Sequence, residues 1–181
     1  YDYDTYFASP STFEMVVTNC NTGRAEYLTE KDGDRQRLLD ICRASSSLPY
    51  VSNVIDVDGR PYLDGGIVDS IPVGRAIDMG YDRNVLVLTR NRGYRNTSKD
   101  RKIPKFIYKK YPRLRVALSR RIAEYNHQLD MVEEMEDKGL VDVIRPLRPM
   151  DVDRIEKDEK KLEALYEEGF QLGEEYCKLK N

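Results

Sequence analysis

The sequence predicts an α/β protein with a mostly parallel sheet and helices on both faces. Short β-rich runs and segments of helical periodicity follow one another along residues 13–89, which is typical of a layered α/β core. The run from Asn84 to Thr89 is apolar without alternation, as expected of a strand covered on both faces. A chain of 181 residues is long enough for one sizeable core.

The first elements are predicted to be a strand, a turn, a strand and a helix. Residues 13–18 are apolar and β-branched, Asn21 to Gly23 form a turn signal, and a second strand follows at 24–28. Asp34 then precedes apolar residues at helical spacing, and Ser45 to Ser47 end that pattern.

A tight hairpin is predicted next, because residues 54–57 and 60–63 flank Asp58-Gly59, a dipeptide that supplies positive φ angles. Pro72 suits the first turn of a helix that Gly80 can close. The strand at 84–89 follows.

The remainder is predicted to be mainly helical. Residues 91–110 are charged and indicate a loop or a mobile arm. Apolar residues recur every three or four positions from 112 to 138, which indicates one amphipathic helix, and a strand follows at 140–144. Asp158 is expected to cap a last helix.

Composition excludes several classes of protein. With 32 acidic and 30 basic residues the net charge is only −2, so no whole-chain field favours nucleic acid. The three cysteines form no Cys-x-x-Cys pair, which argues against a disulfide framework or a zinc site and favours a reduced, cytoplasmic setting. No apolar run approaches the length of a membrane span, and no leader is recognisable. The missing initiator Met leads us to expect an upstream segment.

The tripeptide Asp64-Gly65-Gly66 is the candidate catalytic motif. Two glycines after an aspartate let another chain segment approach the carboxylate closely, which a general base requires. By itself the tripeptide is first of all a turn signal.

The longer context resembles the patatin-like phospholipase family. The stretches that carry the resemblance, in order and spacing, are Arg43 to Pro49, Asp58 to Tyr62, Asp64 to Val73, Ala76 to Gly80 and Val85 to Leu88. The resemblance covers Phe13 to Arg95 and is most specific from Tyr62 to Pro72. The charged C-terminal region is similar to bacterial members more loosely.

The resemblance implies a serine lipid acyl hydrolase, a phospholipase or esterase with a serine-aspartate dyad. Asp64 matches the catalytic aspartate, and Gly65, Gly66 and Asp69 would position its loop. The implied fold is an incomplete patatin-like three-layer α/β/α sandwich, containing the later strands of the family. Residues 1–95 would be the C-terminal part of the catalytic domain, and residues 96–181 a basic arm with a helical extension.

Two parts of that machinery are absent from the chain. It contains no Gly-x-Ser-x-Gly elbow and no glycine-rich oxyanion loop, both of which belong upstream of Tyr1 in the family's order. Ser45 to Ser47 lack flanking glycines and are no substitute. We therefore expect the chain alone to be inactive. The alternative is a non-catalytic lipid-binding or regulatory module on the same scaffold.

Other candidate residues have simpler explanations. Asp69 is expected to fix the loop, or the start of the helix at Pro72, through backbone N–H groups. His127, the only histidine, falls on the polar side of its predicted helix, which argues against a catalytic triad. Asp56 to Gly59 lacks the later ligands of a calcium loop and is better explained as a hairpin turn, so no metal or cofactor is predicted.

The basic stretch from Lys99 to Arg121 leaves two interpretations open. Its lysines, arginines and aromatic residues suit a peripheral contact with anionic lipid head groups, or they form a solvated arm that offsets the acidic last helix. The expected partners are a lipid or acyl ester substrate and, if sheet edges lack cover, a second copy of the chain. Nucleic acid is not expected.

Overall fold

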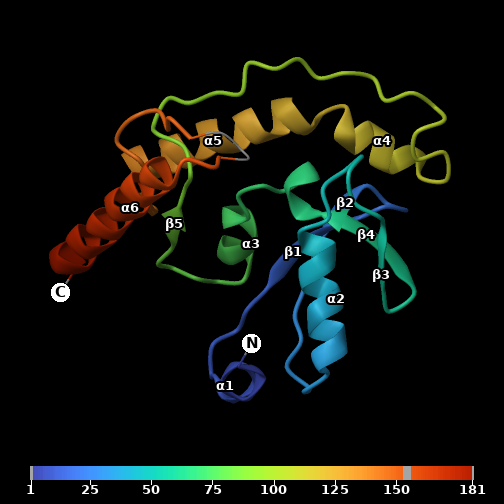
Figure 1. The fold of residues 1–181 in the computed structure, drawn as a ribbon, viewed down its shortest axis with the longest axis horizontal. Coiled ribbons are helices and arrows are strands. Elements are labelled where there is room, and N and C mark those ends of the chain that lie inside the picture. The colour runs from blue at the N-terminus through green and yellow to red at the C-terminus, as the bar shows by residue number, and fades with distance from the viewer. Residues whose placement is uncertain (1, 153–155, 181) are drawn as a thin grey trace. The chain divides into compact units, whose positions relative to one another are not determined.

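The protein has a mixed α/β structure, as the computed structural model shows for residues 2–152 and 156–180 (Figure 1). The predicted α/β class is confirmed. The expected mostly parallel sheet is wrong, because three of the four strand pairings among these described residues are antiparallel. Short turns join the strands of each hairpin, and such connections cannot cross over to make parallel neighbours.

The chain forms two compact units, and each draws on both halves of the sequence. The first comprises Tyr1–Pro72 and Thr97–Gln128, and the second comprises Val73–Asn96 and Leu129–Asn181. Both units therefore contain residues from either side of position 95. The division into a catalytic part and an extension at that position stays a prediction.

The first unit is built on a four-stranded antiparallel sheet with the order β2-β1-β4-β3. The turn between β3 and β4 contains Asp58 and Gly59 at φ 55° and 75°, which confirms the predicted hairpin. β4 pairs with β1 so that Asp64 lies opposite Val17. The strands are β1 (Met15–Asn19), β2 (Arg24–Leu28), β3 (Ile55–Val57) and β4 (Arg60–Asp64).

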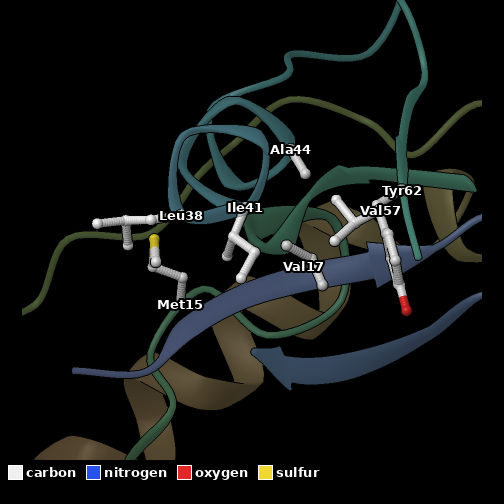
Figure 2. Packing of buried hydrophobic residues seen from close by; sticks show 7 residues of the cluster. All are labelled: Met15, Val17, Leu38, Ile41, Ala44, Val57 and Tyr62. Carbon is white, nitrogen blue, oxygen red and sulfur yellow. The ribbon is translucent and has the colours of Figure 1, made fainter. Parts of the chain in front are cut away.

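Helix α2 (Arg35–Ser45) packs on this sheet and forms its main core. Asp34 caps the helix, since its side chain accepts from the backbone N–H of Arg37 at 2.9 Å. Figure 2 shows Ile41 of the helix beside Val17 of β1. The cluster contains Met15, Val17, Leu38, Ile41, Ala44, Val57 and Tyr62. A short helix that the sequence did not indicate, α1 (Tyr3–Ala8), adds aromatic side chains to it.

The predicted helix at 112–138 is divided into α4 (Pro112–Leu118) and α5 (Arg121–Asp137). Asp100, from the preceding loop, accepts hydrogen bonds from the N–H groups of Ile122 and Ala123, each at 3.0 Å. The first turn of α5 therefore has a cap of its own, which a continuous helix would not need. Two leucines of α4 are buried in a second cluster with Cys20, Leu63 and Ile67.

The second unit contains a parallel pair of strands, β5 (Val85–Val87) and β6 (Asp142–Ile144), together with helices α3 (Val73–Asp78) and α6 (Glu159–Lys180). Pro72 immediately precedes α3, and Gly80 follows it at φ 84°. The expectation that the strand at 84–89 is covered on both faces is wrong. Only Leu86 is buried, while Val87 is 75% exposed.

Arginine-carboxylate pairs hold residues 92–95 against the later part of α5 within this unit. Arg92 binds Glu136 and Asp137, and Arg95 binds both carboxylate oxygens of Glu133 at 3.0 and 3.1 Å. The loop predicted at 91–110 is confirmed as having no helix or strand among its residues, but this end of it is anchored.

The Glu133 pairing makes a testable contribution to stability. Hydrogen bonds from Arg95, with one from the Gly93 N–H, lower the pKa of Glu133 from 4.5 to about 2. Because the folded pKa is depressed, the stabilisation is present above pH 4.5 and is lost as the pH falls toward 2. Glu133→Gln should lower the free energy of unfolding by about 2–3 kcal/mol near pH 6, and the difference should vanish near pH 2.

Urea unfolding between about pH 2 and pH 7 would check this expectation. The matched control is Glu163→Gln on α6, since Glu163 is exposed and forms no ion pair in the described part of the chain. A pH-independent difference for Glu133→Gln would contradict the assignment of the pair.

Candidate active site

Asp64 is the last residue of β4, and its backbone is fixed on both sides. Its N–H donates to the carbonyl of Ser47 at 3.0 Å, and its own carbonyl accepts from the Thr18 hydroxyl at 2.8 Å. Together with the pairing to Val17, these bonds determine where the side chain leaves the sheet.

The Asp64 carboxylate has one oxygen held and one oxygen open. Oδ1 accepts from the Gly66 N–H at 2.7 Å, so that Asp64 caps the short 3₁₀ turn η1 (Gly65–Ile67). Among the described residues, no hydrogen bond reaches Oδ2, and the side chain is half-buried. An oxygen in this position is available to accept a proton from a group placed beside it.

Close packing requires the glycine at position 65 and leaves little space for a side chain at position 66. A Cβ at Gly65 would lie 2.4 Å from the Val16 carbonyl oxygen, and a Cβ at Gly66 would lie 3.0 Å from Asp64 Oδ1. Gly65 therefore lets the turn lie against β1, and Gly66 leaves room beside the carboxylate.

The carbonyl of Gly66 is held by two side chains. Arg121 Nε donates to it at 3.1 Å, and the Ser70 hydroxyl donates at 3.0 Å. These bonds fix the peptide that presents the Gly66 N–H to Asp64. The sequence placed Arg121 only in the basic stretch, and no local pattern reveals its role at the loop.

Asp69 lies in a network that closes the other end of the loop. Its carboxylate accepts from the Tyr27 hydroxyl at 2.6 Å and from the Gln128 side-chain amide at 2.8 Å. The Gln128 amide oxygen in turn accepts from the N–H groups of Ser70 and Ile71 at 3.0 and 3.2 Å. The expected bonds to backbone N–H groups thus run through Gln128, which the sequence analysis missed.

Gln128 is therefore expected to be a structural support of the loop. Gln128→Ala would leave the N–H groups of Ser70 and Ile71 and the Asp69 carboxylate short of partners, and should cost about 1–3 kcal/mol of stability. Thermal or urea unfolding measures this cost, with Gln36→Ala on exposed α2 surface as the control. Equal losses in the two variants would contradict this role.

Other sequence candidates lie outside this arrangement. The hydroxyls of Ser45, Ser46 and Ser47 donate to the carbonyls of Val16, Cys42 and Arg43. His127 is exposed, as predicted. Asp56 accepts from the Gly59 N–H at 2.9 Å, in keeping with a hairpin turn. In the described residues, no group of three or more His, Cys, Asp or Glu side chains could hold a metal ion.

A pocket of about 350 Å³ opens beside the loop in the first unit. Ile67 and Val68 contribute apolar surface to it, and three arginines outnumber one acidic residue, Glu124, in its lining. Asp64 is not among its lining residues. The pocket could accept an apolar group that carries an anionic substituent.

Two family models match separate parts of the chain. Residues 5–77 match the patatin-like phospholipase family, and residues 111–179 match a domain of unknown function, DUF6363. The first segment, at the N-terminal end of the chain, contains Asp64, both glycines and Asp69, and it belongs to the patatin-like phospholipase family. This assignment agrees with the mixed α/β structure as an incomplete patatin-like fold.

A curated relative matches over a shorter length. The uncharacterized protein YjjU of Escherichia coli (strain K12) is 41% identical over 56 residues, which are 30% of this chain. The match spans only 16% of the length of that relative.

No helix among residues 2–152 and 156–180 is sufficiently long and apolar to cross a membrane.

Proposed function

We propose that the parent protein, meaning the full-length protein that contains this chain, is a serine lipid acyl hydrolase with Asp64 as general base. The observation that carries this proposal is the Asp64 carboxylate, which has one oxygen held by Gly66 and the other open, in a segment of the patatin-like family. Gly65, Gly66 and Asp69 position the loop.

In the proposed reaction Asp64 moves a proton twice. A serine attacks the acyl carbonyl while Asp64 Oδ2 takes the hydroxyl proton, and the leaving alcohol then receives that proton as the acyl-enzyme forms. Asp64 next takes a proton from water, which attacks the acyl-enzyme, and returns it to the departing serine. The products are an alcohol and a carboxylic acid.

The motifs indicate which parts of the catalytic machinery lie in this chain and which lie elsewhere in the parent protein. Residues 1–181 contain no Gly-x-Ser-x-Gly, so the nucleophile and the oxyanion loop are proposed to lie N-terminal to Tyr1. Residues 1–95 would form the later part of the catalytic domain, and residues 96–181 an extension. The chain alone would then be inactive. A cytoplasmic location, with peripheral membrane contact through Lys99 to Arg121, completes the proposal.

Self-association is proposed for helix α6. Leu162, Tyr166 and Phe170 are 43%, 65% and 54% exposed and share one face, and the two aromatic rings stack at 6.2 Å. Such a face is commonly covered by a partner. Light scattering after gel filtration would report the mass of the parent protein.

The alternative function is a non-catalytic lipid-binding module. The absence of a serine elbow from 181 residues, together with the basic stretch, favours it over other non-enzymatic functions. This module would bind vesicles and hydrolyse nothing.

Labelling with a fluorophosphonate distinguishes the two functions. The parent protein should be labelled at one serine within a Gly-x-Ser-x-Gly and should hydrolyse p-nitrophenyl butyrate, whereas residues 1–181 alone should do neither. A parent protein that is not labelled and has no esterase activity would refute the hydrolase and leave the binding module.

A further inference from the structure

Two loops of the first unit are joined at their tips. The N–H of Tyr50 donates to the Tyr108 hydroxyl at 2.8 Å, and the ring centroids are 5.9 Å apart. Tyr50 belongs to a turn closed by a hydrogen bond from Ser52 N–H to the Leu48 carbonyl. Tyr108 belongs to the consecutive turns at 105–110. We call residues 48–52 and 105–110 the two-loop patch.

The backbone of the two-loop patch is held in an uncommon conformation. Tyr50 and Tyr108 have φ angles of 70° and 49°, which cost non-glycine residues about 1–3 kcal/mol each and persist only where surrounding contacts enforce them. Ile103, Tyr108 and Tyr111 supply such contacts by packing against the buried cluster around Cys20 and Leu63. The packing against this buried cluster therefore holds the two-loop patch in place.

Its outer side is apolar and uncovered. Val51 is 82% exposed, Phe106 is 80% exposed, and Tyr50 is 58% exposed. These residues lie within two positions of the Tyr50–Tyr108 contact, one set on each loop. An anchored pair of turns that holds apolar side chains in water is typical of a surface that binds an apolar partner.

The charge around the patch selects the kind of partner. Residues 101–123 contain nine lysines and arginines and no acidic residue, and residues 45–53 contain no charge. Lys102, Lys105, Lys109 and Lys110 are exposed and form no ion pair in the part of the chain that the structure describes. Arg92, Arg95 and Arg145, in contrast, are all paired with carboxylates.

We propose that the two-loop patch docks the protein on an anionic lipid surface. Val51, Phe106 and Tyr50 enter the boundary between head groups and acyl chains, while the lysines remain among the head groups. An anionic membrane supplies both the apolar depth and the negative charge, whereas a nucleic acid would gain nothing from Val51. The inference rests on the proposed function in that it locates the membrane contact of the lipid hydrolase.

Vesicle sedimentation with the parent protein tests the docking. Vesicles of phosphatidylcholine with about one third phosphatidylglycerol should bind the protein, and binding should weaken as salt is added because exposed charges are screened. Val51→Ser with Phe106→Ser should weaken binding at least tenfold, as should Lys105→Gln with Lys109→Gln and Lys110→Gln. The control is Val87→Ser with Leu147→Ser, which removes similarly exposed apolar side chains from the second unit.

Each result of these binding measurements either supports or overturns the docking proposal. Unchanged vesicle binding in the patch variants, or an equal loss in the control, would overturn the proposal. The proposal would also be overturned if the protein does not bind vesicles but binds a single-stranded oligonucleotide tightly, and if the Val51 and Phe106 changes leave that binding unaffected. Hydrolysis of soluble p-nitrophenyl butyrate separates the docking proposal from the hydrolase proposal. The docking variants should keep this hydrolysis. If the wild type binds vesicles but does not hydrolyse the ester, only the hydrolase proposal is refuted.

Discussion

Asp64→Asn in the parent protein is expected to lower kcat/KM for short-chain esters by a factor of about 10²–10⁴, the usual contribution of a general base. Asparagine keeps the shape of the side chain, and its amide oxygen can still accept from the Gly66 N–H. The group that replaces Oδ2 is an NH₂, which cannot take the serine proton. The loss should therefore appear in kcat/KM while the fold is unchanged.

Steady-state kinetics with p-nitrophenyl butyrate and thermal unfolding would be measured together. Asp56→Asn is the matched control, because Asp56 accepts a backbone N–H in a turn much as Asp64 does but lies in the β3–β4 hairpin. Wild-type kcat/KM in Asp64→Asn would refute the role of Asp64. A large fall in its melting temperature would instead indicate a structural role.

Gly65→Ala is expected to produce a large loss of stability. The added Cβ would lie 2.4 Å from the oxygen and 2.5 Å from the carbon of the Val16 carbonyl, and this neighbour is strand backbone rather than a flexible side chain. Either β1 or the turn must move, which places the cost at about 3 kcal/mol, the upper end for overpacking. Because the turn supplies the Gly66 N–H to Asp64, activity should fall as well.

Urea unfolding of Gly65→Ala and Gly74→Ala provides the comparison. Gly74 lies in α3, and a Cβ there would meet nothing within 4 Å. Alanine should thus stabilise that helix by about 0.5–1 kcal/mol. If both variants are as stable as the wild type, the close approach of Gly65 to β1 is refuted.

Local chemistry explains which elements the sequence could predict. The Asp58-Gly59 turn and the helix that follows Asp34 depend on residues within a few positions of each other, and the structure has both. The place of Asp64 at the end of a strand, followed by a tight glycine turn, was predictable for the same reason.

Long-range contacts explain what the sequence did not show. Gln128 and Arg121 reach the Asp64 loop from α5, more than fifty positions away, and nothing in their own neighbourhood marks them. After the break between α4 and α5, the new helix start is capped by Asp100, which lies in a loop of no regular pattern. Val87 stays exposed although its strand pairs with β6, and the apolar run from 84 to 89 could not indicate this exposure.

The pairing of Val17 with Asp64 also restricts how this part of the chain can change in length. Successive side chains of β4 point to opposite faces, so one residue inserted between Arg60 and Asp64 would exchange the faces of all residues on one side of the insertion. An insertion before Leu63, which is fully buried, would turn Leu63 out of the core and turn Asp64 into it. The tip lacks this alternation of faces, and a Cβ at Gly59 would meet nothing within 4 Å, although Asp58 binds Arg37 of α2. Insertions and deletions are thus compatible with the hairpin tip and incompatible with the strand that ends at Asp64.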